Sequence, residues 1–492
     1  MITDSILIIY TLAFGIVLLF SIGQLALVIF YLKNKKKSVS IAPLVISDKL
    51  PFVTVQLPVF NELYVVERLI DAVANFNYPK NKLEIQILDD STDETVELII
   101  NKVAFWKAKG IDIKHITREK NIGFKAGALQ NGLQTAKGSL IAIFDADFIP
   151  PVNFLSNEML EPFNALETGM VQARWEHLNI GYSMLTRVQA FGLNAHFSIE
   201  QAGRNTEGLL MNFNGTAGIW RKKCIEDAGG WQFDTLTEDL DLSYRAQLKG
   251  WKFHYIENQS IPAELPVEMN AIKSQQFRWT KGAVETSKKM IFPIWKSKIN
   301  FKQKIFASLH LMNSYVFLFA FLTGIFSVPL LIIKNTSVGY ENFFKLLSLF
   351  LIAFFIIIFF YLVASLQYKK PTWKAIFNFL GMFPVFLSIS MGMTYQNTKA
   401  VILGMIGKKT PFIRTPKFNI IFNSDRFDAN KYLSHKLSGG LLIEILLAIY
   451  YSFGIASAIY FVDYGLLPFH LMLFSGFLAI SVYSIMHSRV KV

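Results

Sequence analysis

The apolar residues of this chain gather in long runs near its two ends. The first run, Ile6 to Leu32, carries no charge and is long enough to cross a hydrocarbon core of about 30 Å. Four more runs of sufficient length, each with at most one charge, follow in the second half: Tyr315–Ile333, Leu346–Leu366, Leu441–Val462 and Leu466–Met486. This pattern predicts five membrane-spanning helices.

The pattern changes between about Pro51 and Ile299. Short β-rich runs such as FVTVQLPVF, LEIQILDD and SLIAIFDADF alternate there with amphipathic stretches. Such alternation is typical of an α/β domain with a mainly parallel sheet. The predicted fold is therefore an α/β domain inserted among transmembrane α-helices.

Basic residues predict the orientation in the membrane. The run KNKKK at Lys33 to Lys37 follows the first span directly, so the positive-inside rule puts the N-terminus outside and the α/β domain in the cytoplasm. Tyr368-Lys369-Lys370 and a later basic loop are expected on the same side. The basic residues of that loop are Lys399, Lys408, Lys409, Arg414, Lys417, Arg426, Lys431 and Lys436.

The segment from Trp373 to Thr398 is apolar but interrupted by Lys374, Gly381 and Pro384. It lies between two basic segments that are both expected in the cytoplasm, so an even number of crossings must separate them. About 26 residues are too few for two full spans of about 20 each. We therefore predict an interfacial or re-entrant helix here.

Composition narrows the possible functions. Hydrophobic residues make up 52% of the chain and charged residues 17%, as expected for a protein that lies partly in a membrane. The net charge of +13 is explained by basic residues beside the apolar runs, and because no basic, aromatic-interleaved motif occurs, no nucleic-acid partner is expected. The single cysteine, Cys224, excludes an internal disulfide and is expected in the core.

Carboxylates follow two of the predicted strands. LEIQILDD ends in Asp89 and Asp90, and SLIAIFDADF carries Asp145 and Asp147 with one residue between them. Alternate residues of an extended strand point the same way, so Asp145 and Asp147 can face one cation. Oxygen ligands suit Mg²⁺ or Mn²⁺, which would neutralise a diphosphate. Asp-x-Asp alone is also a common turn sequence, so its context decides.

Further motifs lie downstream in a fixed order. Thr237-Glu238-Asp239 is followed by Gln275-Gln276-Phe277-Arg278-Trp279. With Asp90 and Asp145-Ala146-Asp147, these motifs resemble the D, DxD, (T)ED, QxxRW signature of the processive family 2 glycosyltransferases. The match is closest to the plant cellulose-synthase-like glucomannan synthases, across VQLPVFNE, QILDDSTDET, GFKAGAL, FDADF, VQARW, FNGTAG, AGGW, EDLDL, LKGWKF and QQFRW.

This resemblance covers roughly Val53 to Gly282. It implies a GT-A (Rossmann-like) fold, a nucleotide-sugar donor and inversion at the anomeric carbon. It also implies that Asp90 contacts the base or ribose, that Lys125 approaches the phosphates, and that Asp145 and Asp147 hold the metal and the diphosphate.

By the same resemblance, Asp239 is the general base, with Glu238 on the acceptor side. The chemistry of the residues agrees, because one carboxylate can remove the proton of an acceptor hydroxyl while the metal helps the diphosphate to leave.

The pentapeptide QQFRW has helical spacing, so Gln275 and Arg278 lie near one another and face the donor. Arg278 then supplies a fixed cation for phosphate, and Trp279 offers a flat apolar face to an acceptor sugar. The alternative for Trp279 is packing in a helix interface. The loop with Asn214 is expected on the acceptor side, with an ordinary turn as the alternative.

Three other features have weaker interpretations. His196 and Glu200 share a helix face at i and i+4 but lack the rest of a metal motif, so they are interpreted as structural. Glu444 lies near a span end, where water can solvate it, and is given no role. Thr410 to Phe418 resembles the gating loop of bacterial cellulose synthases, with Thr415 and Lys417 at the corresponding positions; the alternative is a basic loop at lipid headgroups.

The predicted function is a membrane-embedded inverting hexosyltransferase that extends a β-linked polysaccharide and translocates it. GDP-mannose and UDP-glucose both stay open as donors, and accessory subunits are left open. The runner-up is a lipid glycosyltransferase of the ceramide-glucosyltransferase kind. A transporter would leave the cytoplasmic carboxylates without a purpose.

The expected location is a bacterial inner membrane, with the catalytic domain in the cytoplasm. The predicted parts are an N-terminal anchor (1–37), a catalytic domain (38–300), transmembrane helices 2 and 3 (301–370), the interfacial helix and TPFIRTPK loop (371–440), and transmembrane helices 4 and 5 (441–492).

Overall fold

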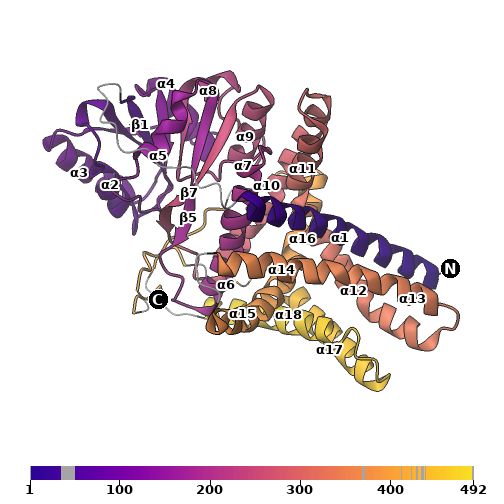
Figure 1. The fold of residues 1–492 in the computed structure, drawn as a ribbon. Helices are drawn as coiled ribbons and strands as arrows, with labels where there is room; N and C mark the ends of the chain where they lie inside the picture. Colours follow the sequence, from indigo (N-terminus) through magenta and orange to yellow (C-terminus); the bar gives the residue numbers. More distant parts are fainter. Residues whose placement is uncertain are drawn as a thin grey trace.

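The chain folds into an α/β domain and a bundle of long helices, as the computed structural model shows (Figure 1). The structure describes residues 2–34, 50–367, 372–411, 413–422, 424–427, 430–433, 437 and 439–489. Three parts of the predicted basic clusters lie outside the described residues: Lys35–Lys37, Tyr368–Lys370 and Lys436.

The α/β domain is built on a mixed sheet of seven strands in the order β3-β2-β1-β4-β6-β5-β7. Strand β1 pairs in parallel with β2 and β4, β2 with β3, and β5 with β7, whereas β6 is antiparallel to β4 and β5. The predicted, mainly parallel α/β sheet is confirmed. The strands are β1 (Val53–Val59), β2 (Leu83–Asp89), β3 (Asp112–Thr117), β4 (Leu140–Ile143), β5 (Thr168–His177), β6 (Gly218–Arg221) and β7 (Lys252–Ala263).

The central strands are buried because helices cover both faces of the sheet. Every residue of β2 and β4 is buried. Val55 and Ile85 belong to one core cluster, and Ile141 belongs to the other together with the fully buried Cys224. The first cluster includes residues of α2 (Val66–Ala74), α3 (Thr95–Ala108) and α5 (Asn157–Leu160), and the second includes residues of α4 (Phe124–Thr135), α8 (Lys222–Asp227) and α9 (Glu238–Leu248).

Two helical segments join the sheet to the bundle. One runs without interruption through α6 (Met184–Ala195), the π-helical turn η3 (His196–Gln201) and α7 (Ala202–Thr206). The other comprises α10 (Met269–Lys296) and α11 (Phe301–Leu311). The first also contacts α1 (Ile2–Asn34), whose Val28 and Tyr31 are buried in the second core cluster of the α/β domain.

Within the part of the chain that the structure describes, six helices are long and apolar enough to cross a membrane. Five correspond to the predicted spans, and the sixth is the ambiguous segment, Trp373–Gly392. These helices are α1, α12 (Val316–Thr336, preceded by the turn Asn313–Tyr315), α13 with α14 (Glu341–Leu347 and Ile352–Leu366), α15 (Trp373–Gly392), α17 (Leu441–Tyr460) and α18 (Leu467–Ser488).

Helix α15 packs mainly against α18 and also contacts α6 of the α/β domain. Phe191 of α6 contacts Phe379 and Phe386, with ring centroids 6.2 and 5.0 Å apart. Met393, directly after the helix, packs with Met269 at the start of α10. The chain then continues as α16 (Thr394–Met405), which packs against α10. The interfacial helix and the count of five crossings both stay predictions.

Glu444 differs from the sequence-based expectation. Its side chain is only 1% exposed, and the Nζ of Lys273 lies 2.7 Å from its carboxylate and 2.9 Å from Ser484 Oγ. The prediction that water solvates Glu444 is wrong, because α10 brings a buried lysine to the inner surface of α17 and α18. The pair ties α10 to the membrane bundle.

We expect Lys273→Met to destabilise the protein strongly, because it leaves the buried Glu444 carboxylate without its cation. Breaking one side of a buried pair loses about 3 to 5 kcal/mol, whereas replacing both partners with apolar residues is often close to neutral. Lys273→Met should therefore lower the midpoint of thermal unfolding, measured on detergent-solubilised protein, and the double variant Lys273→Met/Glu444→Leu should recover most of the loss.

Lys102→Met is the control, because Lys102 pairs with Asp71 at a more exposed site and such pairs contribute little. A double variant as unstable as Lys273→Met would contradict the assignment.

Candidate active site

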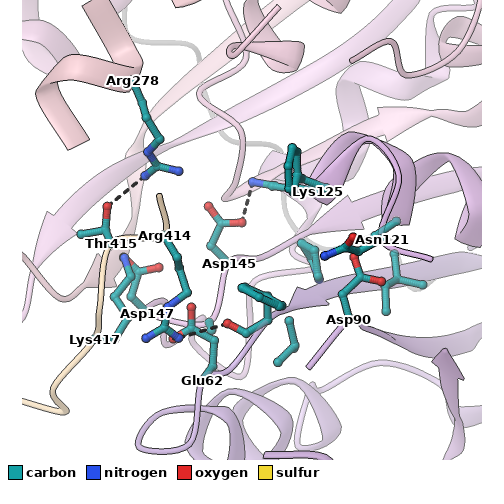
Figure 2. A pocket seen from close by; sticks show the side chains of 17 residues that line it. Glu62, Asp90, Asn121, Lys125, Asp145, Asp147, Arg278, Arg414, Thr415 and Lys417 are labelled. Carbon is teal, nitrogen blue, oxygen red and sulfur yellow. Dashed lines mark hydrogen bonds and ion pairs between the residues drawn. The ribbon is translucent and has the colours of Figure 1, made fainter. Parts of the chain in front are cut away.

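A cavity opens at the carboxyl ends of β1, β2 and β4, where open α/β sheets bind their ligands (Figure 2). Asp90 lines it after β2, and Asp145 and Asp147 line it after β4. Lys125 from α4 and Arg278 from α10 line it as well. Five of the residues predicted to bind the donor or the metal therefore meet at one cavity.

The Asp-Ala-Asp triplet lies in a turn rather than on an extended strand, because β4 ends at Ile143. The backbone N–H of Asp145 donates to Thr216 Oγ1 at 2.9 Å, and the N–H of Phe148 donates to the carbonyl of Asp145 at 3.1 Å. The prediction that Asp145 and Asp147 face one way because they lie on an extended strand is therefore wrong. Both carboxylates nevertheless face the same cavity.

Lys125 links the cavity to the deeper part of the site. Its Nζ lies 2.5 Å from Asp145 Oδ1 and donates to the carbonyl of Gly215 at 2.9 Å. Burial alone would lower the pKa of Lys125, but the charges of Asp145, Glu238 and Asp239 outweigh it and raise the pKa. Lys125 is therefore held as a cation amid carboxylates.

Gly215 lies directly against Asp239. A Cβ on Gly215 would be 3.0 Å from Asp239 Oδ2 and 3.4 Å from Lys125 Nζ, and the residue has a φ of +81°. Only glycine accepts this conformation easily and leaves space for both charged groups. The loop with Asn214 therefore reaches the predicted base closely.

Glu238 and Asp239 lie in the first turn of α9. Thr237, the residue before them, contacts α10. The hydroxyl of Thr237 lies 3.1 Å from that of Thr286, and Gly282 approaches the Thr237 backbone closely. Burial, followed by repulsion from Glu238, raises the pKa of Asp239 to about 7, and burial also raises the pKa of Glu238. A pKa near neutrality is what a general base needs.

Of the three predicted site residues in QxxRW, one reaches the cavity and two do not. Gln275, Arg278 and Trp279 are all half-buried on α10, but only Arg278 lines the cavity. Asp239, Glu238 and Asn214 do not line it either, and Asp239 lies on the side of Lys125 and Gly215. The predicted acceptor residues and Gln275 are thus outside the lining of the cavity.

The loop of residues 410–418, apart from position 412, which is not described, lies over the cavity (Figure 2). Lys417 Nζ is 2.5 Å from Asp147 Oδ2, and Arg278 donates to Thr415 Oγ1 at 2.9 Å. Arg414 donates to the carbonyl of Phe60 at 3.0 Å. Arg414, Thr415 and Lys417 of this loop therefore line the cavity together with the strand-end residues.

Sequence reasoning missed three charged residues of the site. Glu62 is buried in the cavity wall, and burial raises its pKa to about 8 although Arg414 and Lys417 lower it. Arg118 holds Asp90, with Nε 2.9 Å from Oδ1. Glu62 and Arg118 each follow a strand end, so the strand-end rule could have found them. Arg414 lies in the loop that resembles a gating loop, but nothing in the sequence near it indicates its contacts with Glu62 and Phe60.

Comparison with known proteins identifies the domain. Residues 51–282 match the family model described as glycosyltransferase like family 2, and residues 220–376 match that of cellulose synthase. Glucomannan 4-beta-mannosyltransferase 2 of Arabidopsis thaliana is 40% identical over 265 residues, which cover 53% of this chain and 50% of the relative. Probable glucomannan 4-beta-mannosyltransferase 7 of Oryza sativa subsp. japonica is 41% identical over 252 residues, which cover 50% and 43%.

A solved structure has the same fold. The mannosyltransferase PcManGT from Pyrobaculum calidifontis, in complex with GDP-Man and Mn²⁺, superposes with a TM-score of 0.52 at 19% identity, covering 83% of this chain and 100% of that one.

Residues 51–282 are therefore similar to family 2 glycosyltransferases and have the GT-A fold, and among the described residues six helices could cross a membrane. The chain is also similar to cellulose synthase and to cellulose synthase-like glucomannan mannosyltransferases. The chain spans about half the length of the curated relatives it matches.

We expect Asp239→Asn to stabilise the ligand-free protein above neutral pH. The raised pKa means that the folded state binds the proton of Asp239 more tightly than the unfolded state. Stability from this group is present at low pH and is lost as pH rises from about 4 to about 7. The variant should therefore unfold at a higher temperature than the unmodified protein at pH 8, with a smaller gain at pH 5.

The control variant removes a carboxylate whose pKa is shifted in the opposite direction. The Trp251 indole lowers the pKa of Asp227, so Asp227→Asn should not gain stability at pH 8. Equal midpoints of thermal unfolding for Asp239→Asn and the unmodified protein at pH 8 would contradict the raised pKa of Asp239.

Proposed function

We propose that this protein is an inverting glycosyltransferase that transfers a hexose from a nucleotide-sugar to a growing β-linked polysaccharide at the cytoplasmic face of a membrane. One observation carries the proposal. Lys125 bridges Asp145 in the donor cavity and the Gly215 loop that lies against Asp239, so a phosphate-binding group and a base of suitable pKa are a side chain apart.

The donor would lie along the cavity. Asp90, held by Arg118, is proposed to contact the base or ribose, and Lys125 and Arg278 supply positive charge for the diphosphate. The names of the plant relatives, and the GDP-Man in PcManGT, favour a mannose donor over UDP-glucose.

A divalent cation fits the residues present. Asp145 and Asp147 offer oxygen ligands, and each already lies 2.5 Å from a lysine ammonium, which indicates that the site is built to hold positive charge there. Among the described residues no cluster of three metal-binding side chains occurs, so the diphosphate would supply the other ligands. Mg²⁺ or Mn²⁺, when bound, would neutralise the leaving diphosphate.

Asp239 is proposed to act on the acceptor. It accepts the proton of an acceptor hydroxyl, whose oxygen then bonds to the anomeric carbon on the face opposite the diphosphate, so the configuration inverts. Lys125 and Arg278 stabilise the negative charge that the departing diphosphate carries. Glu238, Asn214 and Trp279 are proposed to hold the acceptor sugar, with Gln275 supporting Arg278 on the donor side.

The acceptor is proposed to be a polysaccharide rather than a lipid, because the resemblance to glucomannan synthases extends across the whole catalytic region. Coupled translocation through the helical bundle is part of the proposal, since α10 runs from the site to α16, α18 and the membrane helices. That the membrane is a bacterial inner membrane stays a prediction, because the relatives named here are plant proteins.

We also propose that residues 410–418 close the site. In this arrangement Lys417 neutralises Asp147, one of the two carboxylates proposed to hold the cation. The loop and a cation therefore compete for one carboxylate, and loading of the site would displace Lys417 from Asp147.

The proposed function is tested with two radiolabelled donors. Membranes with the protein, given GDP-mannose or UDP-glucose separately, should make a labelled polymer from one of them, and mannanase or cellulase should digest it. Asp239→Asn should lower transfer by about 100-fold or more, since general base catalysis contributes that much, while binding of GDP or UDP stays within a few-fold.

Asp112→Asn, at the amino end of β3, is the matched control and should keep full activity. Label that extracts with lipid solvents and resists both glycanases would instead support the lipid glycosyltransferase.

We expect Lys417→Ala to bind Mn²⁺ several-fold more tightly than the unmodified protein when no nucleotide is present, because no ammonium then occupies Asp147. Binding is measured by electron paramagnetic resonance of free Mn²⁺. Lys431→Ala removes a comparable charge from Asp93 and Glu94, outside the cavity, and should leave the affinity unchanged. Equal affinity of Lys417→Ala and Lys431→Ala would exclude the competition.

A further inference from the structure

A chain of hydrogen bonds runs from the membrane helix α1 to the loop beside Asp239. Gln24 of α1 donates to Glu200 Oε1 at 2.6 Å. The other carboxylate oxygen of Glu200 lies 2.6 Å from Nδ1 of His196, and Nε2 of His196 lies 3.1 Å from Nδ2 of Asn214. The i, i+4 pair interpreted as structural from the sequence therefore reaches a residue of the proposed acceptor site.

The π-helical turn η3 explains how two residues reach Asn214 together. His196 and Gln201 are its first and last residues, and Gln201 donates to Asn214 Oδ1 at 2.6 Å. Residues five apart diverge around an α-helix, but the i→i+5 repeat of a π-helix brings them to one side. Such turns occur frequently at functional sites. Here the turn directs two side chains at one amide.

This series of hydrogen bonds also fixes the orientation of the Asn214 side-chain amide. Burial would raise the pKa of Glu200, but the hydrogen bond and charge of His196, with Arg204 and Gln24, together outweigh burial and lower the pKa, so Glu200 is a carboxylate. A carboxylate only accepts, so Nδ1 of His196 carries a hydrogen, and because Gln201 donates to the oxygen of Asn214, the NH₂ of Asn214 faces Nε2, which accepts from it. Nε2 then requires the NH₂ of Asn214, and Gln201 requires its oxygen.

The backbone that carries this amide lies next to the proposed base, because Gly215 follows Asn214 and lies against Asp239. The backbone N–H of Asn214 donates to Gln172 Oε1 at 3.0 Å, and the N–H of Phe213 donates to Ser243 Oγ, which donates to the carbonyl of Asp239 at 2.6 Å. Asn214 is half-buried, and its NH₂ has a second hydrogen beyond the one directed at His196. That hydrogen is available to a hydroxyl oxygen of a sugar.

We infer that His196 and Glu200 are positioning residues of the acceptor site, which hold the Asn214 amide with its N–H toward an acceptor sugar hydroxyl beside Asp239. Gln24 anchors this chain to α1. The inference rests on the proposed function, because it assumes that a sugar hydroxyl approaches Asp239. It assigns a role in acceptor binding to side chains that touch neither donor nor acceptor.

Three substitutions of His196 separate positioning from packing. His196→Asn keeps a donor near the place of Nδ1 for Glu200 but does not reach Asn214. His196→Gln puts an amide oxygen near the place of Nε2, where it can accept from Asn214. His196→Ala loses both contacts. A positioning role predicts that the glutamine variant is near normal and that the other two are not.

The measurements are the acceptor KM and the binding of nucleotide. With mannohexaose or cellohexaose as acceptor, His196→Ala and His196→Asn should raise the acceptor KM about tenfold, which corresponds to one lost hydrogen bond of about 1.4 kcal/mol. The Kd of GDP or UDP should stay within about twofold, since the hydrogen-bonded residues Gln24, Glu200 and His196 do not line the donor cavity. His196→Gln should keep the acceptor KM within about threefold.

Two results would overturn the inference while the unmodified protein is active: equal acceptor KM values for the glutamine and alanine variants, or a Kd for nucleotide that rises with the acceptor KM. If His196→Ala does not fold, Glu200→Gln decides, because a neutral amide no longer forces the tautomer and should also raise the acceptor KM. Unmodified protein that elongates neither oligosaccharide overturns the proposed function itself, and with it this inference.

Discussion

The site depends on keeping several carboxylates together where water is scarce. Glu62, Asp145, Asp147, Glu238 and Asp239 converge at the ends of the strands, and burial with mutual repulsion raises the pKa of Glu62, Glu238 and Asp239. Four cations from three separate segments offset this charge: Lys125 from α4, Arg278 from α10, and Arg414 and Lys417 from the loop over the cavity. The electrostatics of the site therefore draw distant parts of the chain together.

Helix α10 carries this interaction into the membrane bundle. Near its start, Lys273 is buried against Glu444, and the backbone N–H of Met269 donates to His487 at 3.0 Å. Five residues later Arg278 lines the cavity, and Gly282 touches the turn that begins α9. One continuous helix thus contacts both the candidate site and the helical bundle.

Features that depend on residues close together in the sequence, such as strands and the carboxylates that follow them, were predicted correctly. Apolar runs marked the strands, and the residues after them marked Asp90, Asp145 and Asp147 as a common site. Contacts between distant segments were not predictable in this way. Nothing local to Glu444 shows Lys273, nothing local to Arg414 shows Glu62, and His196 with Glu200 has the spacing of an ordinary helix pair until the π-helical turn is seen.

The contact of α1 with the α/β domain limits how the protein can be divided. Val28 and Tyr31 are part of the domain core, the Gly203 backbone approaches Leu27, and Gln24 holds Glu200. A fragment that begins at residue 50 would expose that core surface to solvent and release one end of the hydrogen-bond chain. The integrity of the candidate site and the position of α1 are therefore inseparable in this architecture, because the first apolar helix is a structural part of the α/β domain.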